Sequence, residues 1–231
     1  MFQRTRHFAP RFRPWDASEA RAAIQEIAAD AQSMLDPAGL WPSHPMEDGV
    51  PDGTGSIYFG AAGVIWALDY LHRGGAQRTL AALAVRSRLG ATWSEVTPSS
   101  GSLALCRHCH GAPGIVTVFA SAPFSTPEFE TLLARGGELT WNAGPLVKGS
   151  NLCHGAGGNG YALLKLYRRT KDPLWLERAR AFAMAAIDQV RGARAAFGRG
   201  RYSLRTGDPG LAVYLWHCMT GEPRFPTIDV L

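Results

Sequence analysis

The sequence predicts an all-α protein built from helical hairpins, and two observations support this class. No stretch alternates convincingly between apolar and polar side chains over five or more residues, as half-buried strands do. A Gly-x-x-Gly turn recurs at intervals of roughly 50 residues, and an apolar segment with helical spacing follows each copy. Such a period is typical of stacked supersecondary units. The four turns are Gly60–Gly63, Gly111–Gly114, Gly155–Gly158 and Gly207–Gly210.

Apolar side chains at spacings of three and four mark the helix faces that we expect to be buried. The first helix follows Asp16 and Glu19, which have the spacing of a capping box. The other four faces follow the glycine turns. In chain order, the five faces are Ile24, Ile27, Ala28, Ala31 and Leu35; Ile65, Leu68 and Leu71; Ile115, Val116 and Phe119; Leu163, Leu166 and Tyr167; and Leu211, Tyr214, Leu215 and Cys218.

Two further helices are expected to alternate with these. Thr126–Pro127 and Asp172–Pro173 each place a capping residue before a proline at the first helical position. Gly136 and Gly192 lie where these two helices are expected to end, because glycine is the commonest residue just beyond a helix.

The composition is that of one globular domain. The 231 residues are 46% hydrophobic and 19% charged, which is enough for one sizeable core. We divide the chain into an N-terminal arm, residues 1–15, and a helical domain, residues 16–231. The net charge of +5 comes from scattered arginines that match no nucleic-acid-binding motif, so no nucleic-acid partner is expected. The longest apolar run, roughly residues 59–68, is too short for a membrane span.

Cysteine and histidine beside two of the glycine turns indicate a metal site. Cys109 precedes the second turn, and Cys153 with His154 precedes the third. Thiolate and imidazole are preferred zinc ligands, and three protein ligands leave one coordination position open, as in catalytic sites. Helix N-termini also stabilise thiolates. We therefore predict Zn²⁺ bound by Cys109, Cys153 and His154.

The residues leave an alternative open at this site. Cys106, three residues before Cys109, could complete a closed structural site, and His108 and His110 are further competing ligands. Cys218 lies on an apolar helix face and is expected in the core. Four unevenly spaced cysteines, two of them next to histidine, argue against a disulfide framework, so a reducing, cytoplasmic location is expected.

The two cysteine segments resemble those of one family. Leu105–Ile115 resembles the Cys-His-Gly-x-Pro-Gly motif of LanC and LanC-like proteins, the lanthionine cyclases. Lys148–Tyr161 resembles their Cys-His-Gly-x-x-Gly-Asn-x-Tyr motif. Residues 56–63 and 202–231 are similar to an early and the closing hairpin of the family. The likeness covers most of the chain, and the two cysteine motifs are its specific part.

The resemblance implies an (α/α) toroid with zinc at one end, held by Cys109, Cys153 and His154. It implies zinc-assisted addition of a cysteine or glutathione thiol to dehydroalanine or dehydrobutyrine, which forms a thioether. The expected partners are a dehydrated peptide and a glutathione-like thiol. The family has about seven hairpins, whereas about four are visible here, so the ring is expected to be incomplete.

The missing hairpins, expected between about Leu89 and Cys106, carry the family's acid/base histidine and aspartate. His110 is then the nearest substitute as the catalytic acid. An open ring edge would expose apolar helix faces and favour self-association.

Two other functions are compatible with the sequence. One is a non-enzymatic module in which zinc provides stability and the concave face binds a peptide or a thiol. The other is a carbohydrate-active enzyme, because (α/α) toroids also host glycosidases. That chemistry needs two carboxylates across a cleft, and the loop candidates are Asp48, Asp52, Glu138 and Asp208.

Overall fold

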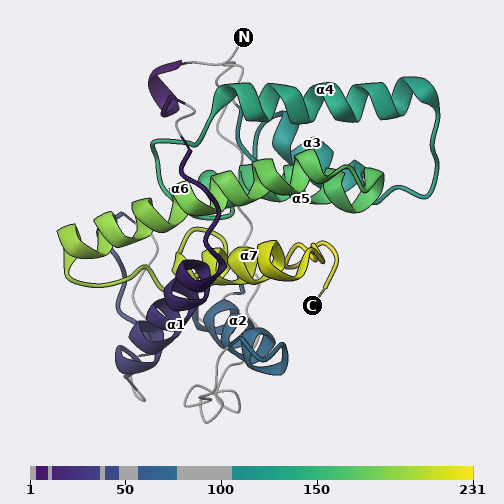
Figure 1. The fold of residues 1–231 in the computed structure, drawn as a ribbon. Helices are drawn as coiled ribbons and strands as arrows, with labels where there is room; N and C mark the ends of the chain where they lie inside the picture. The colour runs from purple at the N-terminus through teal and green to yellow at the C-terminus, as the bar shows by residue number, and fades with distance from the viewer. Residues whose placement is uncertain (1–3, 10–11, 37–39, 47–56, 77–105, 231) are drawn as a thin grey trace.

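The computed structural model describes residues 4–9, 12–36, 40–46, 57–76 and 106–230. Within these ranges the chain is helical and contains no strand, only isolated bridges (Figure 1). The predicted all-α class is therefore confirmed. The segment in which the missing hairpins are expected, about Leu89 to Cys106, lies almost wholly outside the described residues. The elements are η1 (Arg4–Arg6), α1 (Ala17–Ser33), α2 (Ala61–Arg73), α3 (Ala112–Phe119), α4 (Pro127–Ala143), α5 (Ala156–Thr170), α6 (Pro173–Phe197) and α7 (Asp208–Thr220).

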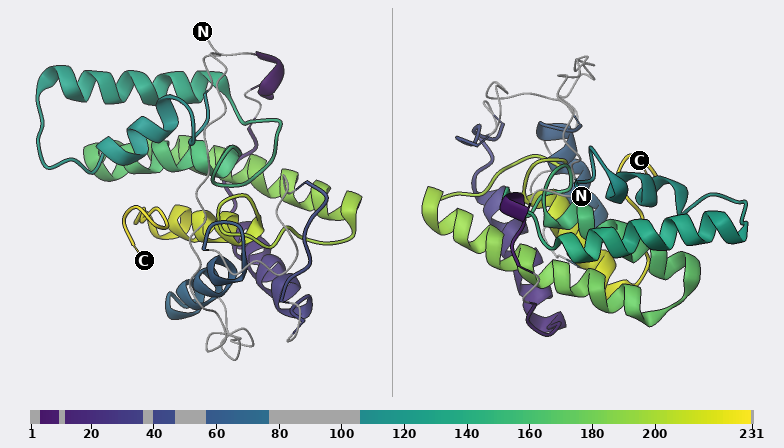
Figure 2. Two further views of the ribbon diagram at one scale, coloured as in Figure 1. Left: turned by 180° about the vertical axis from the view of Figure 1, so that it is seen from behind. Right: turned by 90° about the horizontal axis from the view of Figure 1, so that it is seen from above.

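The helices that follow the four glycine turns, α2, α3, α5 and α7, form a row. Helix α3 packs against α5, α5 against α7, and α7 against α2. The helices α1, α4 and α6 lie alongside this row, and α5 and α6 form the most extensive helix pair. Helix α2 lies at the bottom of the molecule and α3 in its upper part, both in Figure 1 and in the view from behind (Figure 2, left). The described helices thus form an open arc, consistent with an incomplete (α/α) toroid.

The core surrounds α5, α6 and α7. Every residue from Ala156 to Leu166 on α5 is buried, and α7 is buried along most of its length. Gly160 allows α5 and α7 to approach closely, because the Tyr214 hydroxyl lies 1.9 Å from the point that a Cβ would occupy. That hydroxyl donates to the Ala179 carbonyl on α6 at 2.7 Å. These contacts tie the three helices together.

The predicted helix starts are confirmed. Asp16 accepts hydrogen bonds from the amides of Ser18 and Glu19, and Thr126 and Asp172 cap α4 and α6. The predicted ends at Gly136 and Gly192 are wrong, because α4 continues to Ala143 and α6 to Phe197. Gly136 serves close packing instead, since a Cβ there would lie 2.6 Å from the Val116 side chain.

The predicted buried face of α3 is also wrong in part. Val116 is buried, but Ile115 is 55% exposed and Phe119 is 45% exposed. The reason is that α3 lies at one end of the arc and packs against α4 and α5 only, so part of its apolar surface has no neighbouring helix among the described residues. The corresponding faces on α2 and α7 are buried as predicted.

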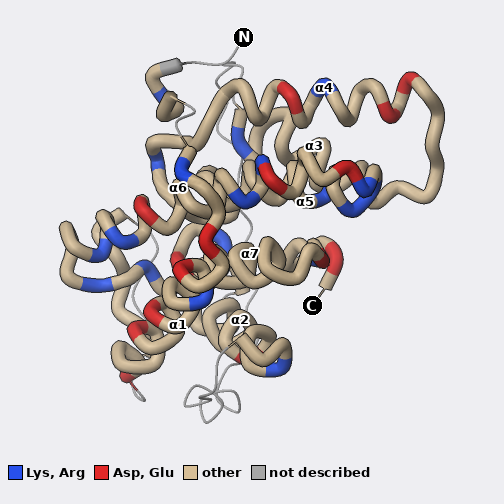
Figure 3. Tube along the Cα trace, viewed as in Figure 1, with Lys and Arg blue, Asp and Glu red and all other residues tan. Residues whose placement is uncertain are grey.

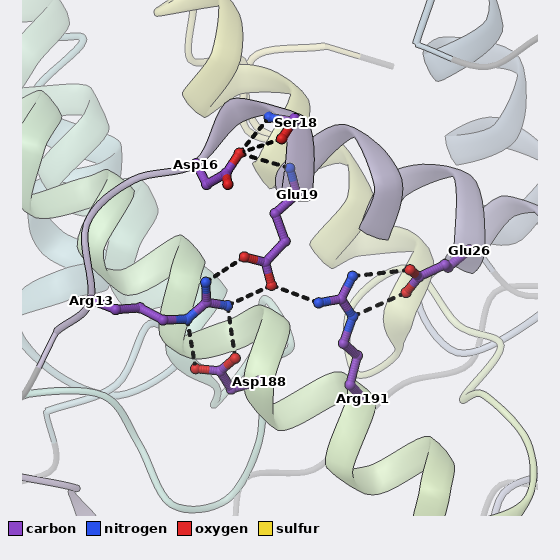
Figure 4. Close-up of polar contacts among 7 residues, drawn as sticks. All are labelled: Arg13, Asp16, Ser18, Glu19, Glu26, Asp188 and Arg191. Atoms are coloured by element: carbon purple, nitrogen blue, oxygen red, sulfur yellow. Dashed lines mark hydrogen bonds and ion pairs between the residues drawn. The ribbon is translucent and has the colours of Figure 1, made fainter.

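The described parts of the N-terminal arm pack onto the helical domain. The amide of Phe8 donates to the Pro145 carbonyl at 2.8 Å, and Phe12 stacks on Trp141. Arg13 bridges Glu19 on α1 to Asp188 on α6, and Arg191 on α6 bridges Glu19 to Glu26 (Figure 4). This network joins the arm, α1 and α6.

No described helix is long and apolar enough to cross a membrane.

Candidate metal centre

The four glycine turns share one backbone geometry. A Cβ on the last glycine of each turn would lie 1.9 to 2.0 Å from the carbonyl oxygen of the residue six positions earlier. Only glycine fits there, because the helix N-terminus rests directly on that carbonyl group. The four glycine–carbonyl pairs are Gly63 with Ile57, Gly114 with His108, Gly158 with Leu152, and Gly210 with Leu204.

The residues that follow these carbonyl groups, Tyr58, Cys109, Cys153 and Arg205, therefore occupy equivalent positions. A chain of backbone hydrogen bonds connects them in the order of the arc. The Cys109 amide donates to the Cys153 carbonyl at 3.1 Å, and the Cys153 amide donates to the Arg205 carbonyl at 2.8 Å. The Arg205 amide donates to the Tyr58 carbonyl at 3.0 Å. The two cysteines are thus neighbours in one hydrogen-bonded ladder of equivalent residues, and they lie at the N-terminal ends of α3 and α5.

The thiols of Cys109 and Cys153 contact each other through a side-chain hydrogen bond. This contact is the main reason that the pKa of Cys153 is lowered and that of Cys109 is raised. His154 and the Arg205 guanidinium also lower the pKa of Cys153, while burial opposes them. These surroundings favour the anionic form of the Cys153 sulfur.

His154 is held beside Cys153. Its backbone amide donates to Asn151 Oδ1 at 3.0 Å, and its side chain hydrogen-bonds to Cys153. The ring is buried, and the described residues provide no hydrogen-bond partner for its Nε2 atom. A buried polar atom without a partner is costly and commonly indicates an absent water or ion.

Unpartnered buried polar atoms are concentrated near the glycine turns. Of the seven such side-chain atoms among the described residues, six belong to residues beside the second, third and fourth turns. They are Arg107 Nε, His108 Nδ1 and Nε2, His154 Nε2, Asn159 Oδ1 and Arg205 Nη1. A site that holds a ligand, ion or ordered water would account for this concentration.

The competing ligands are placed differently. The Cys106 thiol is buried and hydrogen-bonds to Thr140 of α4, and burial raises its pKa to about 11. The ring of His108 is stacked on Phe225 with their centroids 4.3 Å apart. His110 is exposed, in a turn closed by paired backbone hydrogen bonds with Arg107. Cys218 is in the core, as predicted.

Arg205 is a residue of the site that the sequence analysis did not single out. Its guanidinium lies over the rings of Tyr58 and Phe225, at 5.1 and 5.2 Å, and it favours the Cys153 thiolate. A sequence signal exists, because Arg205 stands two residues before Gly207 as Cys109 stands before Gly111. Aligning the turns therefore shows that Arg205 occupies the position of Cys109.

The donor set suits zinc in its chemistry, with two sulfur atoms and one imidazole nitrogen that lacks a partner. Among the described residues, however, no group of three or more His, Cys, Asp or Glu side chains is arranged so that it could hold a metal ion. Convergence on one ion would therefore require the side chains of Cys109, Cys153 and His154 to shift.

The carboxylates considered for sugar chemistry do not form a pair among the described residues. Asp48 and Asp52 lie outside the described ranges. Glu138 on α4 binds Arg178 at 2.5 Å, and Asp208 at the start of α7 lies 3.7 Å from Arg194. The geometry does not favour a glycosidase.

Comparisons with known proteins agree with the resemblance. A sequence model of the family described as "Lanthionine synthetase C-like protein" matches residues 93–230. "Glutathione S-transferase LANCL1" of Danio rerio is 35% identical over 112 residues, which are 48% of this chain and 25% of that protein. "LanC-like protein GCL1" of Arabidopsis thaliana is 42% identical over 82 residues, which are 34% of this chain and 19% of that protein.

These matches span only about a quarter and a fifth of the two curated relatives. The family match covers more than half of this chain and includes both cysteine turns. The chain therefore belongs to the lanthionine synthetase C-like family.

Proposed function

We propose that this chain binds Zn²⁺ through Cys109, Cys153 and His154, and that it promotes the addition of a cysteine or glutathione thiol to a dehydrated peptide. The contact between the Cys109 and Cys153 thiols carries the proposal. They come from successive turns of the arc, and the side chain of His154 adjoins them. A cluster of two thiols and one imidazole at two helix N-termini can bind a cation and stabilise an anionic sulfur.

The thiol addition conserves all atoms. The substrate sulfur bonds to the β-carbon of dehydroalanine or dehydrobutyrine, and a proton is delivered to the α-carbon. When bound, zinc supplies a positive charge that lowers the pKa of the attacking thiol. Cys109, Cys153 and His154 would use three positions and leave one open.

The protein's own side chains would orient the reactants and move the proton. Arg205 places a fixed positive charge beside Cys153, which favours anionic sulfur in this part of the site. His110 is adjacent to Cys109 and exposed, so its imidazole can reach a substrate from the solvent side. We assign His110 as the general acid that protonates the α-carbon of the enolate.

The name of the Danio rerio relative, a glutathione S-transferase, supports a thiol such as glutathione as the nucleophile. The electrophile would be a peptide that contains dehydroalanine or dehydrobutyrine.

The decisive experiment is metal analysis of the purified protein. We expect about one zinc per chain in the wild type, and loss or strong weakening of binding in Cys153→Ala. Cys218→Ala is the matched control, because it removes a buried thiol outside the site and should keep its zinc. Equal zinc in the wild type and Cys153→Ala would refute the metal assignment.

Activity is then measured by mass spectrometry with glutathione and a dehydroalanine peptide. The product should gain the mass of one glutathione. His110→Asn should lower kcat by about 10²- to 10⁴-fold while zinc binding is retained. Unchanged kcat in this variant would remove His110 from the mechanism without affecting the metal assignment.

A further inference from the structure

Cys109 and Cys153 lie close enough to each other to be joined by a covalent bond. The Cys109 amide donates to the Cys153 carbonyl at 3.1 Å, and the two thiols contact each other. Residues paired across a ladder by a backbone hydrogen bond have Cα atoms about 5–6 Å apart. A disulfide joins residues whose Cα atoms are about 4.4–6.8 Å apart. The backbone pairing therefore holds these two cysteines at the separation that a disulfide needs.

The same two cysteines are the ones that an oxidant in solution can reach. None of the four cysteines is in a disulfide in this structure. Cys109 is exposed and Cys153 is partly exposed, whereas Cys106 and Cys218 are buried. Cys106 is close to Cys109 in sequence, but its thiol is turned to a hydrogen bond with Thr140 on α4. Accessibility and thiol contact thus select Cys109 and Cys153 as the reactive pair.

The surroundings of Cys109 permit the small movement that a covalent bond requires. A disulfide brings the two sulfur atoms to about 2.05 Å, which is closer than two thiols in contact. Cys109 lies three residues before α3, and among the described helices α3 packs mainly against α4 and α5. Helix α3 contains no charged residue, so no ion pair of its side chains has to break when its first turn shifts (Figure 3).

From this geometry we propose that Cys109 and Cys153 form a reversible disulfide when the protein meets hydrogen peroxide. One sulfur attacks the peroxide and breaks its O–O bond, which gives a sulfenic acid and one water. The other sulfur then attacks the sulfenic sulfur, and the hydroxyl group leaves with the thiol proton as a second water. Two thiols are oxidised to one disulfide, and one peroxide is reduced to two waters.

The disulfide and a bound zinc ion exclude each other, because zinc binds both sulfur atoms as thiolates. Oxidation would therefore inactivate the proposed metal site. A thiol such as glutathione would restore the two cysteines by thiol–disulfide exchange and would itself be oxidised to its disulfide. The cross-link does not rest on the proposed function, since it needs only the two thiols and the peroxide.

Mass spectrometry of the full chain tests the proposal. Reduced protein is freed of metal with EDTA and treated with hydrogen peroxide, and the remaining thiols are blocked with iodoacetamide. We expect the wild type to lose the mass of two hydrogen atoms and two blocking sites. Proteolysis without reductant should then yield one pair of peptides linked through Cys109 and Cys153. Dithiothreitol should return both thiols.

Two serine variants serve as a matched pair. Cys153→Ser removes one partner and should give no cross-link, so that Cys109 is oxidised only to sulfenic or sulfinic acid. Cys106→Ser removes a neighbouring thiol outside the pair and should be cross-linked like the wild type. Circular dichroism checks the helical content of both. A wild type that peroxide does not cross-link, or that links Cys106 instead, would overturn the proposal even if a variant failed to fold.

A parallel measurement with added zinc separates this proposal from the metal assignment. If zinc binds both sulfur atoms, it should slow the cross-linking by at least about ten-fold, because it occupies the lone pairs that attack the peroxide. An equal rate with and without zinc would contradict the assignment of Cys109 and Cys153 as ligands. The cross-link itself is expected in either case once EDTA has removed the metal.

Discussion

Helices α5 and α3 begin with the same turn but have different surroundings. In both, the last glycine of the turn rests on a carbonyl oxygen six residues earlier, and a cysteine follows that carbonyl group. Helix α5 contacts α3, α4, α6 and α7, and its first eleven residues are all buried. Among the described helices, α3 packs mainly against α4 and α5 and leaves Ile115, Val118 and Phe119 exposed. The turn thus determines how the helix starts, and the neighbouring helices determine which side chains are buried.

The sharpest test of this difference is truncation of one apolar residue in each helix. Leu163→Ala in α5 removes a fully buried side chain and should lower the free energy of unfolding by about 2–5 kcal/mol. Ile115→Ala in α3 removes a half-exposed one and should cost less than about 1 kcal/mol. Urea denaturation measures both. Equal losses would show that the two helices are not packed differently.

The glycines of the two turns provide a second test. Gly158→Ala would place a Cβ 1.9 Å from the Leu152 carbonyl oxygen and 2.9 Å from the Cβ of His108, in fully packed surroundings. We expect a loss of about 1–3 kcal/mol or more in the free energy of unfolding. Gly114→Ala meets the His108 carbonyl oxygen at 2.0 Å, but α3 lies at the end of the arc and can shift. Its loss should be smaller, and a larger loss would contradict the comparison.

Acid titration tests the ion pair that joins the α4–α5 hairpin. Arg169 on α5 lowers the pKa of Glu130 on α4 from 4.5 to about 2. Because the folded pKa is lowered, the stabilisation is present above pH 4.5 and is lost as the pH falls toward 2. The pair is partly exposed, so the expected loss is only about 1 kcal/mol. In Glu130→Gln this part of the pH dependence should disappear, and an unchanged acid profile would show that the pair is not responsible.

The smallest expected effect is a gain in stability. Gly192 lies within α6, and a Cβ there would meet nothing within 4 Å. Gly192→Ala should raise the free energy of unfolding by about 0.5–1 kcal/mol, because alanine loses less backbone entropy in a helix. Thermal unfolding measures the change. Gly136→Ala is the contrasting variant, because its Cβ would meet Val116 and it should destabilise the protein.

The predicted elements show how far local sequence information extends. Asp16, Thr126 and Asp172 were identified as helix caps, because a cap depends on residues within one turn of each other. Gly136 and Gly192 were expected to end their helices, but the helices continue through both. A glycine within a helix costs only about 1 kcal/mol, and the packing of α4 and α6 against their neighbours outweighs this cost.

The candidate site also has parts that the sequence predicts and parts that it does not. The positions of Cys109 and Cys153 relative to their turns could be predicted, because the turn motif fixes the backbone locally. The placement of Arg205 beside Cys153 could not be predicted from composition, since it depends on a third turn that lies about 50 residues further along the chain. The metal assignment and the role of His110 stay predictions.

By itself, the sequence determined the helical class, the four repeated turns, the helix starts and the family, because each rests on short-range patterns or on motif likeness. Only the tertiary structure decided which helices became neighbours. In this arrangement α5 is buried and one face of α3 is exposed. The same arrangement joins Cys109, Cys153, Arg205 and Tyr58 in one hydrogen-bonded ladder. The physical reason is that burial and backbone pairing between repeats depend on which surfaces meet in space, and a helical pattern specifies an apolar face without specifying what covers it.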